Sequence, residues 1–263
     1  MDFLSELTIH LLGKELSTTS FIIVLLCGFM IGIAKTGLSG AGLAVVPLMA
    51  FVFGGKPSTG LLLPILIMAD IFAVKYYNRH AQWTHIWKLL PWAFLGVVIG
   101  VLTGKYISDM LFNQALSFLV ILGVVLMIWQ DVRGDKLSIP NHWIFAVLMG
   151  LLGGFSTMIG NAAGSVMAIY LLAMRLPKNH FIGTGAWFFL IINVFKVPFH
   201  VFSWHTITWQ TFLFDLLILP AILLGVFTGI KVVKRIPEKL FKILIIVTII
   251  ITAVFILIKL FGN

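Results

Sequence analysis

A lysine inside a glycine-rich, otherwise apolar segment is the residue of this sequence that most strongly indicates chemistry. Lys35 lies within G-I-A-K-T-G-L-S-G-A-G at 32–42. Glycine allows a helix to unwind there, and a helix that resumes near residue 41 would offer unpaired N–H groups and the positive end of its dipole to an anion. Neighbours that could add donors or a closely approachable backbone are Thr36, Gly37, Ser39 and Gly40. These residues predict a binding site for a small anion.

A second glycine-rich segment, G-F-S-T-M-I-G-N-A-A-G at 154–164, aligns with the first at an offset of 164 − 42 = 122. Its candidate ligands are Ser156, Thr157, Gly160 and Asn161. Inside a bilayer, irregular backbone is tolerated only where protein or a water-filled cavity provides hydrogen-bond partners for its N–H and C=O groups. Two breaks at matching positions of a repeat therefore predict one shared central site. Polar residues on the following helices are Thr59, Thr184, Asn193 and Lys196. They could line the same cavity or serve interhelical hydrogen bonds.

Two acidic residues, Asp70 and Asp215, lie within apolar spans. Asp70 is the stronger candidate for binding a coupling proton, because an ionisable group at this depth is normally kept for a partner or a function. Alternatively, Lys35 forms a structural ion pair with Asp70 or extends toward the membrane surface. Six of the seven histidines stand at span edges without H-x-x-x-H spacing or cysteine partners. We therefore expect no metal site, no cofactor and no catalytic residue.

The composition places these residues in a bilayer. Of 263 residues, 60% are hydrophobic and 10% charged, whereas soluble proteins carry about 25% charged residues. This predicts a multi-pass membrane protein. The formal net charge of +9 comes from cations spread over short loops, where topology and anionic lipid headgroups account for it. Membrane lipid is therefore an expected partner and nucleic acid is not.

Apolar windows bounded by charges, prolines and glycines predict an all-helical fold. The windows are 18–34, 42–54, 58–78, 88–106, 111–129, 142–158, 163–174, 181–202, 208–231 and 239–261. Two of them, 42–54 and 163–174, are too short for an upright crossing of a ~30 Å hydrocarbon core. The expected organisation is an N-terminal interfacial segment with a short helix at 1–17, a transmembrane repeat at 18–130, a loop at 131–141 and a second repeat at 142–263.

Three matches in the same order indicate a duplication. Besides the two breaks, Lys56 pairs with Lys178, and G-V-L-T-G at 100–104 matches G-V-F-T-G at 225–229 at an offset of 225 − 100 = 125. Leaving Lys35 aside, an inverted arrangement with both termini outside divides the Lys and Arg residues twelve against five, whereas a parallel one gives nine against eight. The five are Lys14, Lys56, Lys105, Lys196 and Lys259. The positive-inside rule therefore favours an inverted repeat, each half beginning with a broken helix or a re-entrant pair.

The two breaks, Pro47 and G-T-G-A at 183–186 resemble those of the TauE/SafE family of membrane permeases, over nearly the whole chain. The A-K-T-G of Ala34 to Gly37 is similar to the lysine-bearing subset of that family, whereas M-I-G-N-A-A-G departs from the commoner triple-glycine form. The resemblance implies export of sulfite, sulfoacetate or another organosulfonate across the bacterial inner membrane. Such an anion suits one lysine, two helix ends and a few hydroxyls.

The sequence as a whole favours a secondary transporter, an exporter that alternates access around a midplane anion site between the two broken helices. An intramembrane serine protease using Ser39 and an anion channel stay open as alternatives. The protease would need a base at the depth of Ser39, where no histidine follows mid-span, and the channel would need a continuous polar pore. We therefore expect a transporter and not an enzyme. The sequence is also compatible with a homodimer.

Overall fold

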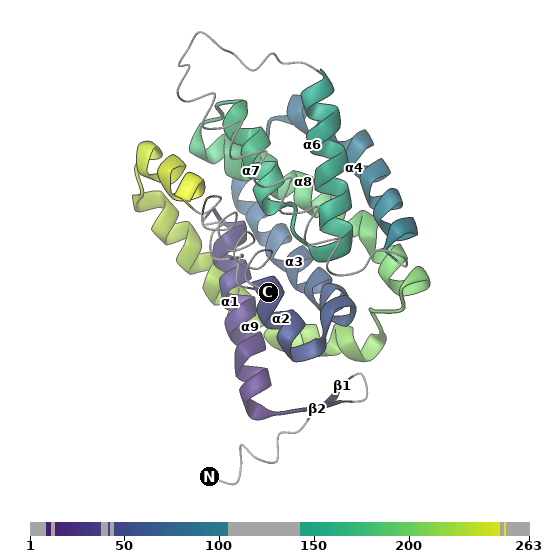
Figure 1. Ribbon diagram of the computed structural model, residues 1–263. Coiled ribbons are helices and arrows are strands. Elements are labelled where there is room, and N and C mark those ends of the chain that lie inside the picture. Colours follow the sequence, from purple (N-terminus) through teal and green to yellow (C-terminus); the bar gives the residue numbers. More distant parts are fainter. Residues whose placement is uncertain are drawn as a thin grey trace.

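Helices make up nearly all of the computed structural model, which describes residues 9–11, 14–37, 42, 45–104, 143–247 and 250 (Figure 1). The main helices are α1 (Thr18–Lys35), α2 (Val45–Phe53), α3 (Gly55–Tyr77), α4 (Trp83–Thr103), α6 (Trp143–Gly160), α7 (Ala163–Ala173), α8 (Lys178–Pro198) and α9 (Trp209–Arg235). A 3-10 turn, η2 (Asn78–His80), follows α3, and a π-helical turn, η4 (Phe199–Ser203), follows α8. Residues 238–247 are helical as well.

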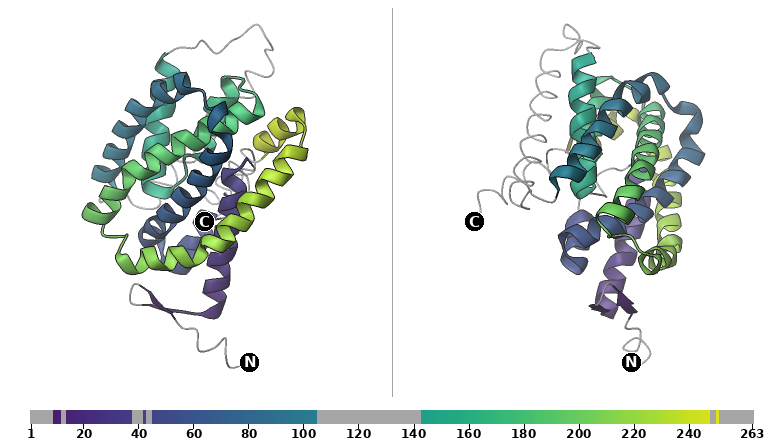
Figure 2. Two further views of the ribbon diagram at one scale, coloured as in Figure 1. Left: turned by 180° about the vertical axis from the view of Figure 1, so that it is seen from behind. Right: turned by 90° about the vertical axis from the view of Figure 1, so that its right-hand side faces the viewer.

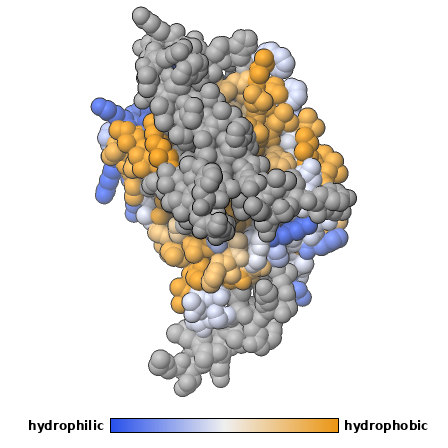
Figure 3. Space-filling view, viewed as in Figure 1, coloured by the Kyte–Doolittle hydropathy of each residue, from blue (hydrophilic) through white to orange (hydrophobic). Residues whose placement is uncertain are grey.

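Six of the described helices are long and apolar enough to cross a bilayer: α1, α3 with η2, α4, α6, α8 with η4, and α9. The helices α2 and α7 hold 9 and 11 residues, or about 14 and 17 Å at 1.5 Å per residue, which is short of a crossing. Large apolar side chains such as Phe51, Phe202 and Leu224 face outward. Where the face in Figure 3 is coloured, it is mainly hydrophobic, with hydrophilic patches at its left and right edges. The predicted all-helical, multi-pass membrane fold is confirmed.

Glycines bring two pairs of helices into backbone contact. A Cβ atom at Gly32 of α1 would meet the backbone of Ile222 and Val226 in α9, and one at Gly154 of α6 would meet the backbone of Ala93 in α4. Small residues allow this approach, and the resulting close packing holds helices together where lipid gives no hydrophobic driving force. The helices α3 and α8 pack on each other between the α1–α9 pair and the α4–α6 pair (Figures 1 and 2).

Contacts along each pair fix the helix directions. Phe21 packs on Phe214 near the starts of α1 and α9, and Gly32 meets Gly225 further along both, so these helices run parallel. The corresponding contacts between α4 and α6 are Leu89 with Gly150, Ala93 with Gly154, and Met158 with Gly100. That pair is parallel too.

The central helices α3 and α8 run antiparallel. Gly183 near the start of α8 lies against Tyr77 at the end of α3, and Gly60 near the start of α3 lies against Thr206 beyond α8. At the end of α3, Tyr76 contacts Lys234 near the end of α9, and Phe53, which ends α2 two residues before α3 begins, contacts Phe214 near the start of α9, so α3 and α9 run parallel. The helices α4 and α8 are parallel too, with contacts Trp83–Trp187 and Phe94–Phe195. Thus α1, α3 and α9 run one way, and α4, α6 and α8 run the other.

The N-terminal segment differs from its prediction. Ile9–Leu11 (β1) and Lys14–Leu16 (β2) form an antiparallel hairpin with Ile9 opposite Leu16, where the sequence predicts a short interfacial helix. Gly13 stands between the two strands in the sequence, and glycine disfavours a helix interior by about 1 kcal/mol relative to alanine. The helix α1 begins directly afterwards, because the Ser17 hydroxyl accepts a hydrogen bond from the Ser20 N–H and caps it.

Two further differences concern the spans. The helices α3 and α4 begin at Gly55 and Trp83, three and five residues before the predicted 58 and 88. The charge count places Lys196 among the five cations of the outer side, whereas the structure buries it fully within α8. The predicted span 111–129, the loop 131–141 and the last part of 239–261 lie outside the described residues.

Replacing Gly154 by alanine should destabilise the fold, because its Cβ would collide with the Ala93 backbone. Overpacking of this kind typically costs about 1–3 kcal/mol. Gly164→Ala is the matched control, since nothing lies within 4 Å of a Cβ there. A thiol-reactive dye that labels buried Cys27, the one cysteine of the chain, reports thermal unfolding in detergent. Equal midpoints for the two variants would contradict the close α4–α6 contact.

Candidate functional site

The first break closes α1 and turns the chain. Lys35 is the last residue of α1, and the Thr36 hydroxyl donates to the carbonyl oxygen of Gly32 at 2.9 Å, one of the acceptors a helix end leaves unpaired. Gly37 has φ +129°, and a Cβ atom there would collide with side chains of α8 and α9. Glycine is therefore required at position 37, and Lys35 is held at the point where the helix stops.

The second break separates α6 from α7. The helix α6 ends at Gly160, and Asn161 adopts φ 53°, a left-handed conformation that asparagine tolerates better than most residues. The helix α7 resumes at Ala163, and its N-cap, Ala162, supplies no side-chain hydrogen bond. The first-turn N–H groups of α7 are thus left without a side-chain cap, and Asn161 stands beside them.

Asp70 of α3 joins the first break to α8. The Lys35 Nζ atom lies 2.9 Å from Asp70 Oδ1 and 3.2 Å from Oδ2, and 4.2 Å from the centroid of the Phe189 ring. The Asn193 side-chain amide donates to the same Oδ2 at 2.8 Å. Asp70 is fully buried, so one cation and one amide compensate its charge inside the protein. The Lys35–Asp70 ion pair left open by the sequence is present.

Lys196 of α8 connects this ion pair to the second break. Its Nζ donates to Asn161 Oδ1 at 2.6 Å, Thr157 Oγ1 at 3.1 Å and Asn193 Oδ1 at 3.3 Å. Asn161 in turn donates through Nδ2 to the Thr59 carbonyl at 3.1 Å. Three acceptor oxygens match the three N–H bonds of an ammonium group. Lys196 is fully buried, and within the described residues no carboxylate forms an ion pair with it.

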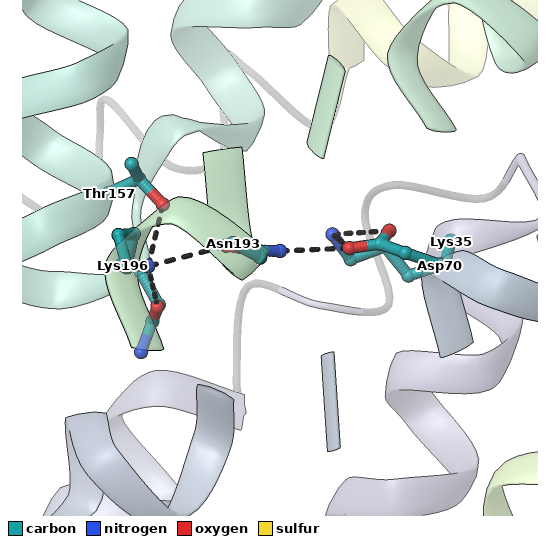
Figure 4. Close-up of polar contacts among 6 residues, drawn as sticks. Lys35, Asp70, Thr157, Asn193 and Lys196 are labelled. Carbon is teal, nitrogen blue, oxygen red and sulfur yellow. Dashed lines mark hydrogen bonds and ion pairs between the residues drawn. The ribbon is translucent and has the colours of Figure 1, made fainter. Parts of the chain in front are cut away.

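These contacts form one polar chain, defined here as Lys35, Asp70, Asn193, Lys196, Thr157 and Asn161. Figure 4 shows Lys196 at one end, Asn193 in the middle, and Asp70 with Lys35 at the other end. With ordinary charges, two lysines and one aspartate leave 2 − 1 = +1 in this chain. The aspartate lies on the Lys35 side, so the uncompensated positive charge belongs to the Lys196 end. A buried uncompensated cation favours an anionic ligand.

The structure gathers part of the predicted site. Five predicted residues belong to the polar chain: Lys35, Asp70, Thr157, Asn161 and Asn193. The hydroxyls of Thr36 and Ser156 donate to carbonyls of their own helices. Thr184 accepts from the Gln82 N–H, where α8 meets the start of α4.

The remaining candidates are backbone positions or lie elsewhere. Gly37 and Gly160 shape the breaks, whereas Ser39 and Gly40 lie outside the described residues. Lys196 was named only as one of several polar residues that could line the cavity. Its signal in the sequence is a lysine one turn after Asn193 on an otherwise apolar helix. Among the described residues, no group of three His, Cys, Asp or Glu side chains could hold a metal ion.

The fold and the site define a multi-pass membrane protein built around a buried cationic centre, as transporters are. The sequence profile of the family described as "Sulfite exporter TauE/SafE" matches residues 24–256. The chain therefore belongs to the TauE/SafE family of membrane transporters, as the resemblance predicted. Membership supports a transporter over an enzyme and gives no support to the protease or channel alternatives.

A second comparison agrees with this assignment. A protein of Haemophilus influenzae described as a probable membrane transporter protein is 26% identical over 167 residues. The match covers 59% of this chain and 65% of that protein, slightly under two thirds of its length. No solved structure matches the chain.

Lys35→Met should destabilise the protein, because it leaves the buried Asp70 carboxylate without a cation. Breaking a buried pair by removing one partner typically costs about 3–5 kcal/mol. Adding Asp70→Asn should recover part of that loss, since the bare charge is removed. Thermal unfolding of the two single variants and the double variant gives the coupling energy. Strictly additive losses would mean that the two side chains do not interact.

Proposed function

We propose that this protein is a secondary transporter that exports a small sulfur oxyanion, sulfite or an organosulfonate such as sulfoacetate, across the cell inner membrane. One observation carries the proposal: Lys196 is a fully buried lysine whose Nζ atom is bonded to three neutral oxygens. The family is described as a sulfite exporter family, which supports the substrate class.

Binding of the anion would replace weak partners with a strong one. An oxygen of a sulfite or sulfonate group takes the place of Asn161 or Thr157 at Lys196 Nζ, and a charge-assisted hydrogen bond forms. The uncapped first turn of α7, which follows directly, presents N–H groups and a positive dipole end to the same anion. The segment Ser39 to Gly42, which the sequence aligns with the start of α7, is our candidate for the opposite contact.

Asp70 has a different role in this proposal. Its contacts with Lys35 and Asn193 make it a fixed counter-ion that holds the Lys35 charge at the first break. The anion then meets a site in which only the charge of Lys196 is available.

The repeat arrangement supplies a mechanism of alternating access. Matching helices of the two predicted repeats, α1 with α6, α3 with α8 and α4 with α9, run in opposite directions in this structure. This supports an inverted repeat, in which moving one half against the other exchanges inward-facing and outward-facing states. The polar chain crosses from α1 through α3 and α8 to α6, so such a motion would act on it directly.

Lys196→Gln should weaken transport of the anion. A hydrogen bond to a charged group contributes about 1.5–3 kcal/mol, which corresponds to about a ten- to hundredfold higher half-saturating concentration. Tracer uptake into proteoliposomes with sulfite, sulfoacetate, sulfate and acetate measures this, and Lys239→Gln at an exposed lysine is the control. A Lys196→Gln variant that matches wild type would move the site elsewhere. If the wild type moves no anion, the proposed function is wrong.

The inverted repeat places Lys56 outside and its counterpart region at Asn179 inside the cell. Both residues are exposed. In a Cys27→Ala background, Lys56→Cys should react with a membrane-impermeant maleimide in intact cells. Asn179→Cys should react only after permeabilisation. Labelling of both from the same side would rule out the inverted arrangement.

A further inference from the structure

A second buried acid, Asp215, lies apart from the polar chain. It is in the second turn of α9 and is fully buried. Neither of its carboxyl oxygens has a hydrogen-bond partner, and among the described residues no cation forms an ion pair with it. Buried polar groups normally have partners, so this carboxyl requires an explanation.

Apart from Thr211, the buried residues nearest Asp215 along α9 are apolar. Phe214 packs edge-on against Phe21 of α1 and Phe53 of α2, with ring centroids 6.2 and 6.3 Å away. One turn later, Ile218 fills the space beside Gly28 of α1. An ionised carboxylate without a partner costs several kcal/mol in such an environment.

Among the described residues of the neighbouring helices α1, α2 and α3, no ionisable group forms a hydrogen bond or an ion pair with Asp215. On α1 they are Lys35, paired with Asp70, and the buried thiol of Cys27. The helix α3 carries Asp70, the exposed Lys75 and three groups with other contacts. Of these three, Lys56 lies over the Trp204 ring, the Tyr76 ring lies under Lys234, and the Tyr77 hydroxyl donates to the Thr36 carbonyl. The helix α2 carries none. No contact in this set reaches Asp215.

Packing does not require an acid at this position. The offset of 125 that aligns the two G-V-x-T-G motifs relates position 215 to 215 − 125 = 90, which is Leu90 of α4. Leu90 is 2% exposed, so an apolar side chain fills the matching place in the other repeat. Asp215 is therefore an asymmetric addition to an otherwise matched pair of helices.

We propose that Asp215 is the proton-binding site that couples anion transport to a pH gradient. This rests on the proposed transport function and names its coupling ion. In the described conformation the carboxyl holds a proton, which removes its charge and with it the largest part of the cost of burying it without a partner. Water is close, because the six residues from Trp209 correspond to about 9 Å of helix. One proton adds from water on one side and returns to water on the other after the helix pairs move.

Infrared spectroscopy of the purified protein tests the proton directly and needs no substrate. At neutral pH the wild type should show the carbonyl band of a protonated carboxyl group. Asp215→Asn should lose this band, and Asp215→Glu should shift it. Glu238→Gln, at an exposed acid, is the control and should leave it unchanged. Identical spectra for wild type and Asp215→Asn would overturn the proposal.

Transport then tests the coupling. Labelled sulfite and sulfoacetate are supplied to proteoliposomes whose membrane potential is clamped with potassium and valinomycin. One pH unit can sustain up to about a tenfold anion gradient for each coupled proton. The wild type should respond to the pH gradient. Asp215→Asn should keep anion exchange but lose this response, and Asp215→Glu should restore part of it.

The outcomes separate the two proposals. Anion transport in the wild type with an unaltered pH response in Asp215→Asn overturns the proton site and leaves the transporter in place. Transport in the wild type without any pH response does the same. No transport of either anion by the wild type overturns the proposed function, while the infrared result still decides whether Asp215 holds a proton.

Discussion

Charge inside an apolar layer has to be compensated within the protein, and the structure is arranged around that constraint. Four helices contribute to the polar chain, and two of them stop or bend where they do so: α1 ends at Lys35, and α6 ends beside Asn161. The charged groups of the chain are Asp70 and the two lysines, which reach each other through Asn193. Removing one member would leave its buried partners with fewer hydrogen bonds or without a counter-ion, so the breaks and the central α3–α8 contact depend on one another.

The glycine contacts make the α1–α9 and α4–α6 pairs rigid, and the polar chain links one pair to the other. Backbone contact between α1 and α9 and between α4 and α6 leaves little room for sliding within each pair. Between the pairs, α3 and α8 pack on each other, and the polar chain adds hydrogen bonds of 2.6 to 3.3 Å, which can exchange partners at a small net cost. A ligand that binds within the chain would therefore act on the relative position of whole helix pairs.

Much of this fold follows from the sequence. Hydropathy and glycine spacing locate the membrane helices, the two short helices and the breaks, because bilayer thickness and backbone satisfaction constrain them directly. The partners within the site are harder to predict. The sequence indicates Lys35 and Asp70 as a possible pair, but it does not distinguish Lys196 as the central group among several polar residues, because hydropathy does not show which face of a helix is buried. The orientation of hydroxyls such as Thr36 and Ser156 toward their own helices depends on local geometry that residue type alone does not fix.

The neutral partners of Lys196 also bear on how a carrier can release its cargo. A lysine paired with a carboxylate would have little affinity for an anion, because its charge is already compensated. A lysine without any partner would bind the anion too tightly for release. Thr157, Asn161 and Asn193 lie between these extremes, because they satisfy the ammonium group when the site is empty and compete with the anion when it is full. Occupied and empty states then differ by an exchange of hydrogen bonds, a condition that favours turnover over capture.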